Sequence, residues 1–213
     1  MSDTLRGVLA AFALPTPPDD ALIARIDAFF ALRAKWAQAH NLSGPRALRD
    51  PAGTDLADAA ALAALVEADL PLVDVGAGSG VPAVLVALLR PDLSVVAVEP
   101  LAKRAAFLRQ AGVTFGLTRL RVERASWPVP LSEPVQVVSR AVFPVPQWPA
   151  WAVSGGPHVV RVHRYLAKER PEFGQPTFAL TGALDYAGPD GTPHRLESWS
   201  LRDVSRETIG VGA

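Results

Sequence analysis

The sequence contains no cysteine and no long apolar run. The absence of cysteine excludes a disulfide-stapled fold, a thiolate metal site and a cysteine nucleophile at once. No stretch reaches the roughly 18 consecutive apolar residues that a membrane span requires. The first residues, Met1, Ser2 and Asp3, do not begin a signal peptide. We therefore expect a soluble cytoplasmic protein with no membrane partner and no bound metal.

Net charge is also lacking, because 21 Lys and Arg residues balance 21 Asp and Glu residues. A protein that binds polyanions indiscriminately normally carries a surplus of basic residues, so the overall balance disfavours that class. Basic residues are nevertheless concentrated between positions 103 and 124, where Glu123 is the only acid. They are Lys103, Arg104, Arg109, Arg119, Arg121 and Arg124. This stretch is either an ordinary solvated surface or a local patch that contacts phosphate.

The length and composition predict one compact domain with a substantial core. Of the 213 residues, 49% are hydrophobic and 20% are charged, which excludes a disordered chain. Residues 1–68 are predicted to form an N-terminal helical unit, because apolar residues recur there at helical spacing. The helices expected in it lie within 1–15, from 21 to about 40, and at 55–68. Residues 69–213 are predicted to form the core of the same domain.

Strands and helices alternate in this second part of the chain. The expected strands are 70–75, 93–98, 120–123, 135–138 and 159–162, with helices at 83–89 and 102–112. Such alternation predicts a doubly wound parallel α/β sheet. The tail differs, because 177–186 and 195–201 flank a Gly-Pro-Asp-Gly turn and predict an antiparallel hairpin. A Rossmann-like sheet that ends in such a hairpin resembles the fold of class I S-adenosylmethionine-dependent methyltransferases.

A glycine-rich turn lies between the first predicted strand and its helix. It contains Asp74, Gly76, Ala77, Gly78 and Gly80. Glycines at this place let the backbone bend sharply and approach a ligand without a Cβ in the way. Glu99 ends the second predicted strand, 19 residues after Gly80. A carboxylate there can accept hydrogen bonds from both hydroxyls of a ribose.

Two kinds of cofactor compete for this turn. A dinucleotide site favours the pattern G-x-G-x-x-G, and Val81 occupies the position of its third glycine, which disfavours a Rossmann oxidoreductase. S-adenosylmethionine has no pyrophosphate, and its ammonium group needs oxygen acceptors nearby. Asp74 is placed to orient either the loop or that ammonium group. We therefore expect S-adenosylmethionine as the cofactor, with Glu99 holding its ribose.

Short motifs also run along the chain in a fixed order. They are Lys35-Trp36, Asn41-Leu42-Ser43, Leu72–Pro82, Lys103-Arg104, Phe107-Leu108, Ser139-Arg140-Ala141, Gly155-Gly156 and His194-Arg195. Together they resemble the bacterial small-subunit rRNA guanine-N7 methyltransferase family, RsmG, also called glucose-inhibited division protein B. The resemblance implies methylation of guanine N7 in the 530 loop of 16S rRNA, with 16S rRNA or the small ribosomal subunit as partner. We expect the enzyme to be a monomer.

The resemblance also implies roles for individual residues. Arg140 and Asn41 would act as catalytic residues that position the acceptor base, and Arg140 would also contact the cofactor. Ala125 and Ser126 would neighbour the adenine of the cofactor. The residues expected to contact RNA are Lys103, Arg104 and Arg124. Simpler roles compete with these: a surface ion pair for Arg140, a helix end for Asn41, and plain exposed helix positions for the two residues at 103 and 104.

The chain departs from the family pattern on the substrate side. The family carries His-x-x-Asp-Ser where this sequence has Asp55-Leu56-Ala57-Asp58-Ala59, and Lys-Gly after the fifth strand where it has Arg161-Val162-His163-Arg164. Two alternatives therefore stay open: a diverged methyltransferase with another RNA or a small-molecule acceptor, and a non-catalytic cofactor-binding or ribosome-associated protein. Three tryptophans in proline-rich loops either stack on a base or plug the domain edge. They are Trp127, Trp148 and Trp151.

Overall fold

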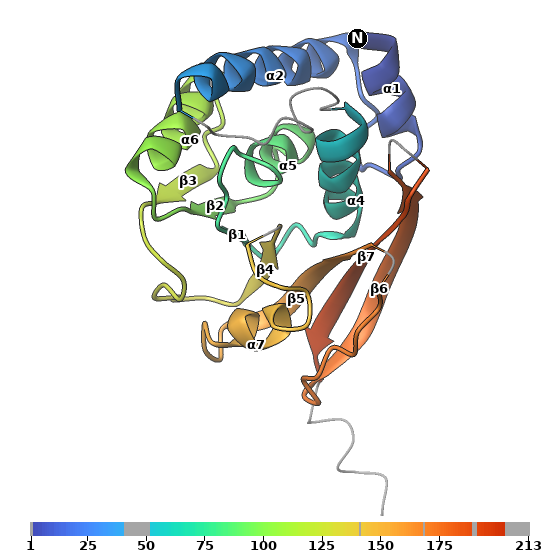
Figure 1. Cartoon of the computed structure of the whole chain (residues 1–213), viewed down its shortest axis with the longest axis vertical. Coiled ribbons are helices and arrows are strands. Elements are labelled where there is room, and N and C mark those ends of the chain that lie inside the picture. Colours follow the sequence, from blue (N-terminus) through green and yellow to red (C-terminus); the bar gives the residue numbers. More distant parts are fainter. Residues whose placement is uncertain (1, 41–51, 141, 168, 189–190, 203–213) are drawn as a thin grey trace, which may run out of the picture.

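The structure, a computed structural model, describes residues 2–40, 52–140, 142–167, 169–188 and 191–202 (Figure 1). Its elements are α1 (Ser2–Ala10), α2 (Asp20–His40), the π-helical turn η1 (Ala52–Leu56), α4 (Ala57–Leu65), β1 (Leu72–Val75), α5 (Ala83–Leu89), β2 (Val95–Val98), α6 (Ala102–Thr114), β3 (Leu120–Glu123), β4 (Val135–Ser139), α7 (Trp148–Val153), β5 (Val159–Leu166), β6 (Phe178–Ala187) and β7 (Pro193–Leu201). The predicted helix at 55–68 is shorter in the structure, because the π-helical turn precedes it and the backbone is extended at Val66.

The sheet has seven strands in the order β3-β2-β1-β4-β5-β7-β6. Strands β1 to β5 are parallel, and β7 lies antiparallel between β5 and β6. The predicted doubly wound sheet with a terminal antiparallel hairpin is therefore confirmed. The chain reverses its winding direction between β1 and β4, and open α/β sheets bind ligands outside the carboxyl ends of their strands at this point.

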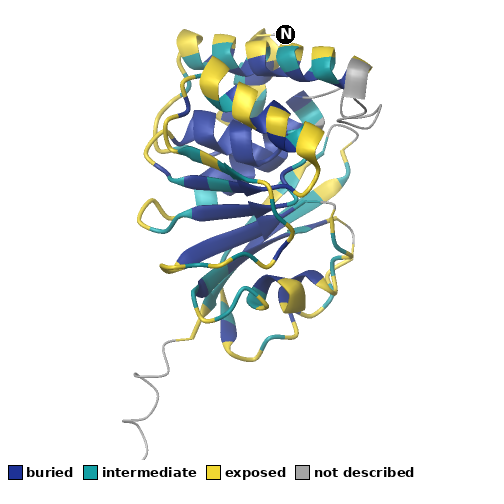
Figure 2. Ribbon diagram, turned by 90° about the vertical axis from the view of Figure 1, so that its left-hand side faces the viewer, coloured by how far each residue is buried: buried dark blue, intermediate teal, exposed yellow. Residues whose placement is uncertain are grey.

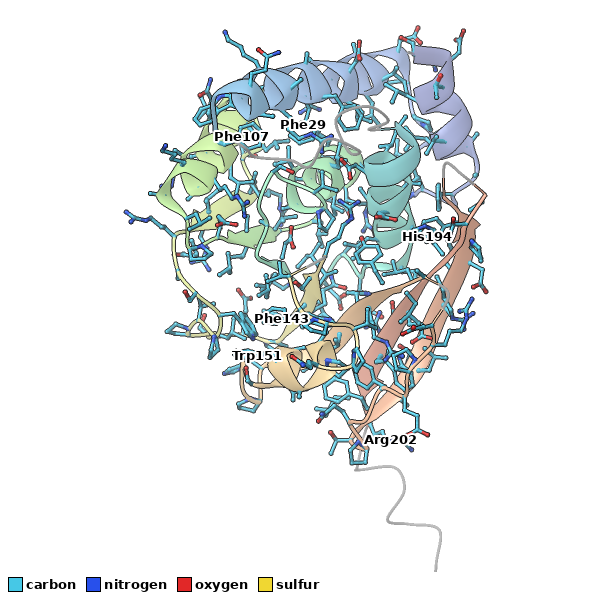
Figure 3. The ribbon with its side chains drawn as sticks, in the orientation of Figure 1. Phe29, Phe107, Phe143, Trp151, His194 and Arg202 are labelled. Carbon is cyan, nitrogen blue, oxygen red and sulfur yellow. The ribbon has the colours of Figure 1, made fainter. Side chains whose placement is uncertain are left out.

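Within the part of the chain that the structure describes, helices α1, α2, α4, α5 and α6 cover one face of the sheet and share one core (Figure 1). Helix α5 is buried along its whole length because it lies between the sheet and α2 and α4, which explains its unbroken apolar sequence. The rings of Phe29 on α2 and Phe107 on α6 lie 6.3 Å apart and are both fully buried (Figure 3). The N-terminal helices thus pack directly on the helices that follow β1 and β2.

The opposite face has much thinner cover. Within the described residues, the connections from β3 to β4 and from β5 to β6 contain no helix, and α7 is short. Aromatic side chains close this core instead, chiefly Trp127, Trp148 and Phe173. Figure 2 shows the central strands of the sheet buried between the two covers. The prediction that Trp148 and Trp151 lie in loops is wrong, because both belong to α7, which begins directly at Trp148.

Strand β5 continues to Leu166, whereas its predicted end is residue 162. Polar residues in the added part made the sequence look like a loop. In the structure each of them has a partner across the strands: Arg164 pairs with Glu197 of β7 at 2.7 Å, and His163 contacts Ser198 at 2.8 Å. Cross-strand pairing therefore carries these polar side chains into the sheet.

Candidate cofactor and substrate site

The glycine turn leaves β1 at the carboxyl edge of the sheet. Gly76, Gly78 and Gly80 all have positive φ angles, of 75°, 54° and 82°, which favour glycine at these positions. The amide of Gly76 donates to the carbonyl of Val98 at the end of β2, at 2.8 Å, and the amide of Ala77 donates to the same oxygen at 3.1 Å. The turn is therefore tied to the end of the neighbouring strand β2.

Asp74 lies beneath this turn and is fully buried. Its Oδ2 accepts a hydrogen bond of 3.0 Å from the amide of Ala83 at the start of α5, whereas its Oδ1 has no hydrogen-bond partner among the described residues. Burial raises the pKa of Asp74 to about 7, against the hydrogen bond from Ala83 and the charge of Arg140, which lower it. One carboxylate oxygen thus holds the start of α5, and the other has no hydrogen-bond partner within the described part of the fold.

We expect the buried Asp74 to make stability decrease with pH. The folded protein keeps a proton on Asp74 up to about pH 7, whereas the unfolded chain releases it near pH 4, so stability decreases between these values and levels off above them. Thermal unfolding near pH 5 and near pH 8 measures the difference. Asp74→Asn, which cannot ionise, should show a smaller loss than the unmodified protein. An equal loss in both would mean that another group causes it.

Glu99 follows β2 and is 2% exposed. Its Oε2 accepts a hydrogen bond of 2.9 Å from the amide of Gly78, and its Oε1 accepts one of 2.9 Å from the amide of Leu101. The side chain therefore links the glycine turn to the residue before α6. Each carboxylate oxygen has capacity for a second donor, so the expected bonds to ribose hydroxyls are compatible with this arrangement and stay a prediction.

Arg140, directly after β4, belongs to a buried charge network. Its Nη2 lies 2.8 Å from Oδ1 of Asp55, and its Nε donates to Oδ2 of Asp58 at 2.7 Å. Asp55 also accepts a 2.5 Å hydrogen bond from Arg33 of α2, and Asp58 accepts one of 2.6 Å from the hydroxyl of Tyr186 on β6. The ion pair that was the alternative to a substrate role is present, and both of its carboxylates are buried, whereas the side chain of Arg140 is 22% exposed.

The network sets the protonation state of Arg140 and Tyr186. Burial alone would lower the pKa of Arg140, but the carboxylates of Asp58 and Asp55 raise it above its ordinary value. Burial raises the pKa of Tyr186, and Asp58 adds to the effect, so the phenol stays protonated and donates. The guanidinium of Arg140, 22% exposed, is thus held as a permanent cation at the edge where β1 and β4 end.

Sequence reasoning did not identify this network, although one signal was present. Arg33 falls on the apolar stripe of α2 together with Ile26, Phe29 and Phe30, and its side chain is 1% exposed. A buried guanidinium requires a buried acid. Asp55, which stands where the family pattern has histidine, supplies it.

The residues expected to contact adenine and RNA lie at the same edge. Lys103 is exposed in the first turn of α6, Arg104 is partly exposed beside it, and Arg124 is exposed directly after β3. Ala125 is partly buried and Ser126 is exposed. These positions follow the carboxyl ends of β2 and β3. Asn41 and Ala141 lie outside the described residues.

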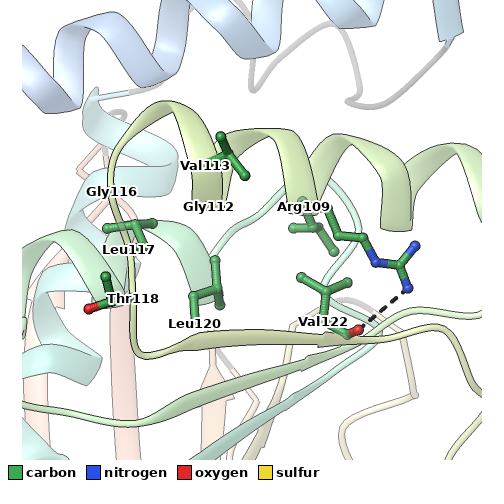
Figure 4. Close-up of a pocket in the computed structure, with 9 residues that line it drawn as sticks. Arg109, Gly112, Val113, Gly116, Leu117, Thr118, Leu120 and Val122 are labelled. Carbon is green, nitrogen blue, oxygen red and sulfur yellow. Dashed lines mark hydrogen bonds between the residues drawn. The ribbon is translucent and has the colours of Figure 1, made fainter.

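The basic stretch from 103 to 124 does not form one patch. Arg119 precedes β3 and therefore lies at the opposite edge of the sheet from Arg124, which follows it. Arg109 donates a 3.5 Å hydrogen bond to the carbonyl of Val122 beside a groove of about 500 Å³ between α6 and β3 (Figure 4). The groove is mainly apolar, and no residue of the glycine turn lines it. The glycine turn and the groove thus belong to different parts of the surface.

His163 has a structural position. Its Nδ1 lies 2.8 Å from Oγ of Ser198 and its Nε2 lies 3.1 Å from Oε1 of Gln136, and it is fully buried. Burial lowers its pKa to about 3, so the ring is neutral. Among the described residues, no group of three His, Cys, Asp or Glu side chains is placed to hold a metal ion. In the same part of the chain, no helix is long and apolar enough to cross a membrane.

The strand order, the antiparallel β7 and the glycine turn after β1 define the class I methyltransferase fold. The solved structure of the S-adenosylmethionine-dependent methyltransferase SibL superposes with a TM-score of 0.53 at 16% identity, over 84% of this chain and 72% of that chain. TYW2 from Pyrococcus horikoshii, solved in complex with MeSAdo, gives a TM-score of 0.52 at 15% identity, over 75% of this chain and 64% of that chain. These likenesses establish the fold.

The chain belongs to the rRNA small subunit methyltransferase G family, GidB, whose model matches residues 22–156. The ribosomal RNA small subunit methyltransferase G of Acidothermus cellulolyticus is 40% identical over 109 residues, which cover 48% of this chain and 49% of the relative. The enzyme of the same name from Paracidovorax citrulli is 35% identical over 159 residues, which cover 67% of this chain and 65% of the relative. In the first match, as in several others, the chain spans about half the length of the curated relative.

Proposed function

We propose that this protein transfers a methyl group from S-adenosylmethionine to N7 of a guanine in 16S rRNA of the small ribosomal subunit. Membership of the family supports the reaction and the acceptor. One observation of the site supports S-adenosylmethionine as the cofactor. Two buried carboxyl side chains, Asp74 and Glu99, flank a glycine turn at the carboxyl ends of β1 and β2. This arrangement suits a ligand with a ribose and a cationic end.

The residues present fit the cofactor. Oδ1 of Asp74 is buried without a partner among the described residues, which is costly unless a donor or cation reaches it. At Gly78 a Cβ would meet nothing nearer than an oxygen at 3.7 Å, so the turn leaves room there. Glu99 would hold the ribose, Asp74 would face the ammonium end, and Ala125 and Ser126 would lie beside the adenine.

When bound, S-adenosylmethionine supplies an electrophilic methyl group. Guanine N7 already presents a lone pair, so the protein needs no general base and acts by alignment and by exclusion of water. Arg140 and Asn41 would position the base, with the cation of Arg140 fixed by Asp55 and Asp58. The exposed Lys103, Arg104 and Arg124 would contact RNA phosphate. The enzyme would act as a monomer in the cytoplasm and without a metal.

The cofactor and the acceptor are tested separately. We expect titration calorimetry with S-adenosylmethionine to show binding in the micromolar to low millimolar range. We also expect small subunits from a strain lacking this protein to gain N7-methylguanine in 16S rRNA when incubated with protein and cofactor. If the titration shows no heat of binding, S-adenosylmethionine is not the cofactor. Binding without rRNA methylation would refute the acceptor and favour a diverged enzyme or a non-catalytic protein.

A further inference from the structure

Three aromatic rings meet beside the end of β4. Phe143 lies against Trp148 with ring centroids 5.5 Å apart and planes at 22°, and against Trp151 with centroids 5.1 Å apart and planes at 27° (Figure 3). Trp148 is 3% exposed, whereas Trp151 is 43% exposed. The cluster therefore presents one large flat ring to solvent, backed by a stacked ring that is itself anchored in the core.

The backbone under Trp151 is fixed by its neighbours. Its carbonyl accepts hydrogen bonds of 2.7 Å from both Nε1 of Trp127 and Oγ of Ser154. The ring nitrogens of Trp127, Trp148 and Trp199 all donate to internal acceptors. The ring nitrogen of Trp151 donates to none of the described residues. Trp151 thus offers both a ring face and an N–H donor to a molecule outside the fold.

The cluster lies at the carboxyl ends of β4 and β5, next to the glycine turn. Phe143 follows Val142, whose methyl groups lie directly against Gly76 of the turn. A hollow of about 80 Å³ at the carboxyl ends of β4 and β5 is lined by Ser139, Phe143 and Trp148, among others. Trp151 stacks on Phe143 of this lining, so its ring lies beside the sheet edge at which open α/β sheets bind ligands.

We propose that Trp151, supported by Phe143, stacks on an unpaired nucleobase of the acceptor RNA. That the acceptor is RNA rests on the proposed function; the stacking site rests on the ring geometry. Every base offers a π face, and an exposed indole backed by a second ring is the platform that proteins use for single-stranded RNA. The N–H of Trp151 additionally suits a phosphate or a base carbonyl.

The test compares base stacking with simple apolar contact. The protein is saturated with S-adenosylhomocysteine, and its affinity is measured for a single-stranded RNA oligonucleotide from 16S rRNA and for an abasic oligonucleotide of the same length. We expect Trp151→Ala and Trp151→Leu to bind the RNA about 10-fold more weakly, and Trp151→Phe to keep most of the affinity. On the abasic probe all four proteins should bind alike.

Leu180→Ala is the matched control, because Leu180 on β6 is 45% exposed and also apolar. It should bind RNA like the unmodified protein. Four results would each overturn the proposal: unchanged RNA affinity in Trp151→Ala, full affinity in Trp151→Leu, no RNA binding by the unmodified protein, or an equal loss of affinity for the abasic oligonucleotide. The proposed function is judged separately, by methylation of 16S rRNA with the unmodified protein.

Discussion

Replacing Asp55 by alanine is expected to lower the free energy of unfolding by about 3–5 kcal/mol. The carboxylate of Asp55 lies between two guanidinium groups, at 2.5 Å from Arg33 and 2.8 Å from Arg140, and is fully buried. The side chain of Arg33 is only 1% exposed, so without this carboxylate its charge has little water to compensate it. Denaturant titration measures the loss.

A matched control distinguishes burial from pairing as such. Asp185 also pairs with two arginines, Arg170 at 3.2 Å and Arg195 at 2.7 Å, but it is 62% exposed. Asp185→Ala should therefore cost about 1 kcal/mol or less. Equal losses in the two variants would contradict the network as the reason for the stability. A small loss in Asp55→Ala would mean that Arg33 finds water or another acceptor after the substitution.

The arrangement of the glycine turn and Glu99, the candidate cofactor site, was predictable from the sequence because its geometry is local. The glycine turn and Glu99 each follow a strand end directly, and the hydrogen bond between Gly78 and Glu99 joins residues 21 apart in the chain. The end of a strand can be recognised in the sequence as the position at which a run of apolar residues is followed by glycine or by an acidic residue. The parallel sheet then brings two such ends together without any further information.

The network around Arg140 was not predictable in the same way. Asp58 accepts hydrogen bonds from Arg140 and Tyr186, which lie 82 and 128 residues further along the chain. No local sequence pattern specifies pairs at such separations. The wrong details of the fold have the same cause. Strand β5 extends past residue 162 because β7 supplies Glu197 and Ser198 as partners, and the helix at Trp148 depends on the sheet face that it covers.

Replacing Gly76 by alanine is expected to weaken S-adenosylhomocysteine binding by about 10-fold or more while the fold persists. Gly76 has a φ of 75°, which is strained for any residue with a Cβ, and that Cβ would overlap the Cγ2 methyl of Val142. The amide of Gly76 is bonded to Val98, so the turn cannot shift freely to relieve the overlap. Either the glycine turn or the segment after β4 must therefore move to relieve the overlap.

Two comparisons separate the overlap from backbone strain. Gly116 has a φ of 58°, and a Cβ added there would meet no atom of the described residues within 4 Å. Gly116→Ala therefore introduces the backbone strain of a positive φ without any steric overlap. Its affinity for the cofactor should lie within about 2-fold of that of the unmodified protein. The double variant Gly76→Ala, Val142→Ala removes the overlapping methyl groups and should regain most of the affinity. If Gly116→Ala binds as weakly as Gly76→Ala, global strain is responsible. If the double variant gains nothing, Val142 is not the neighbour that sets the shape of the cofactor turn.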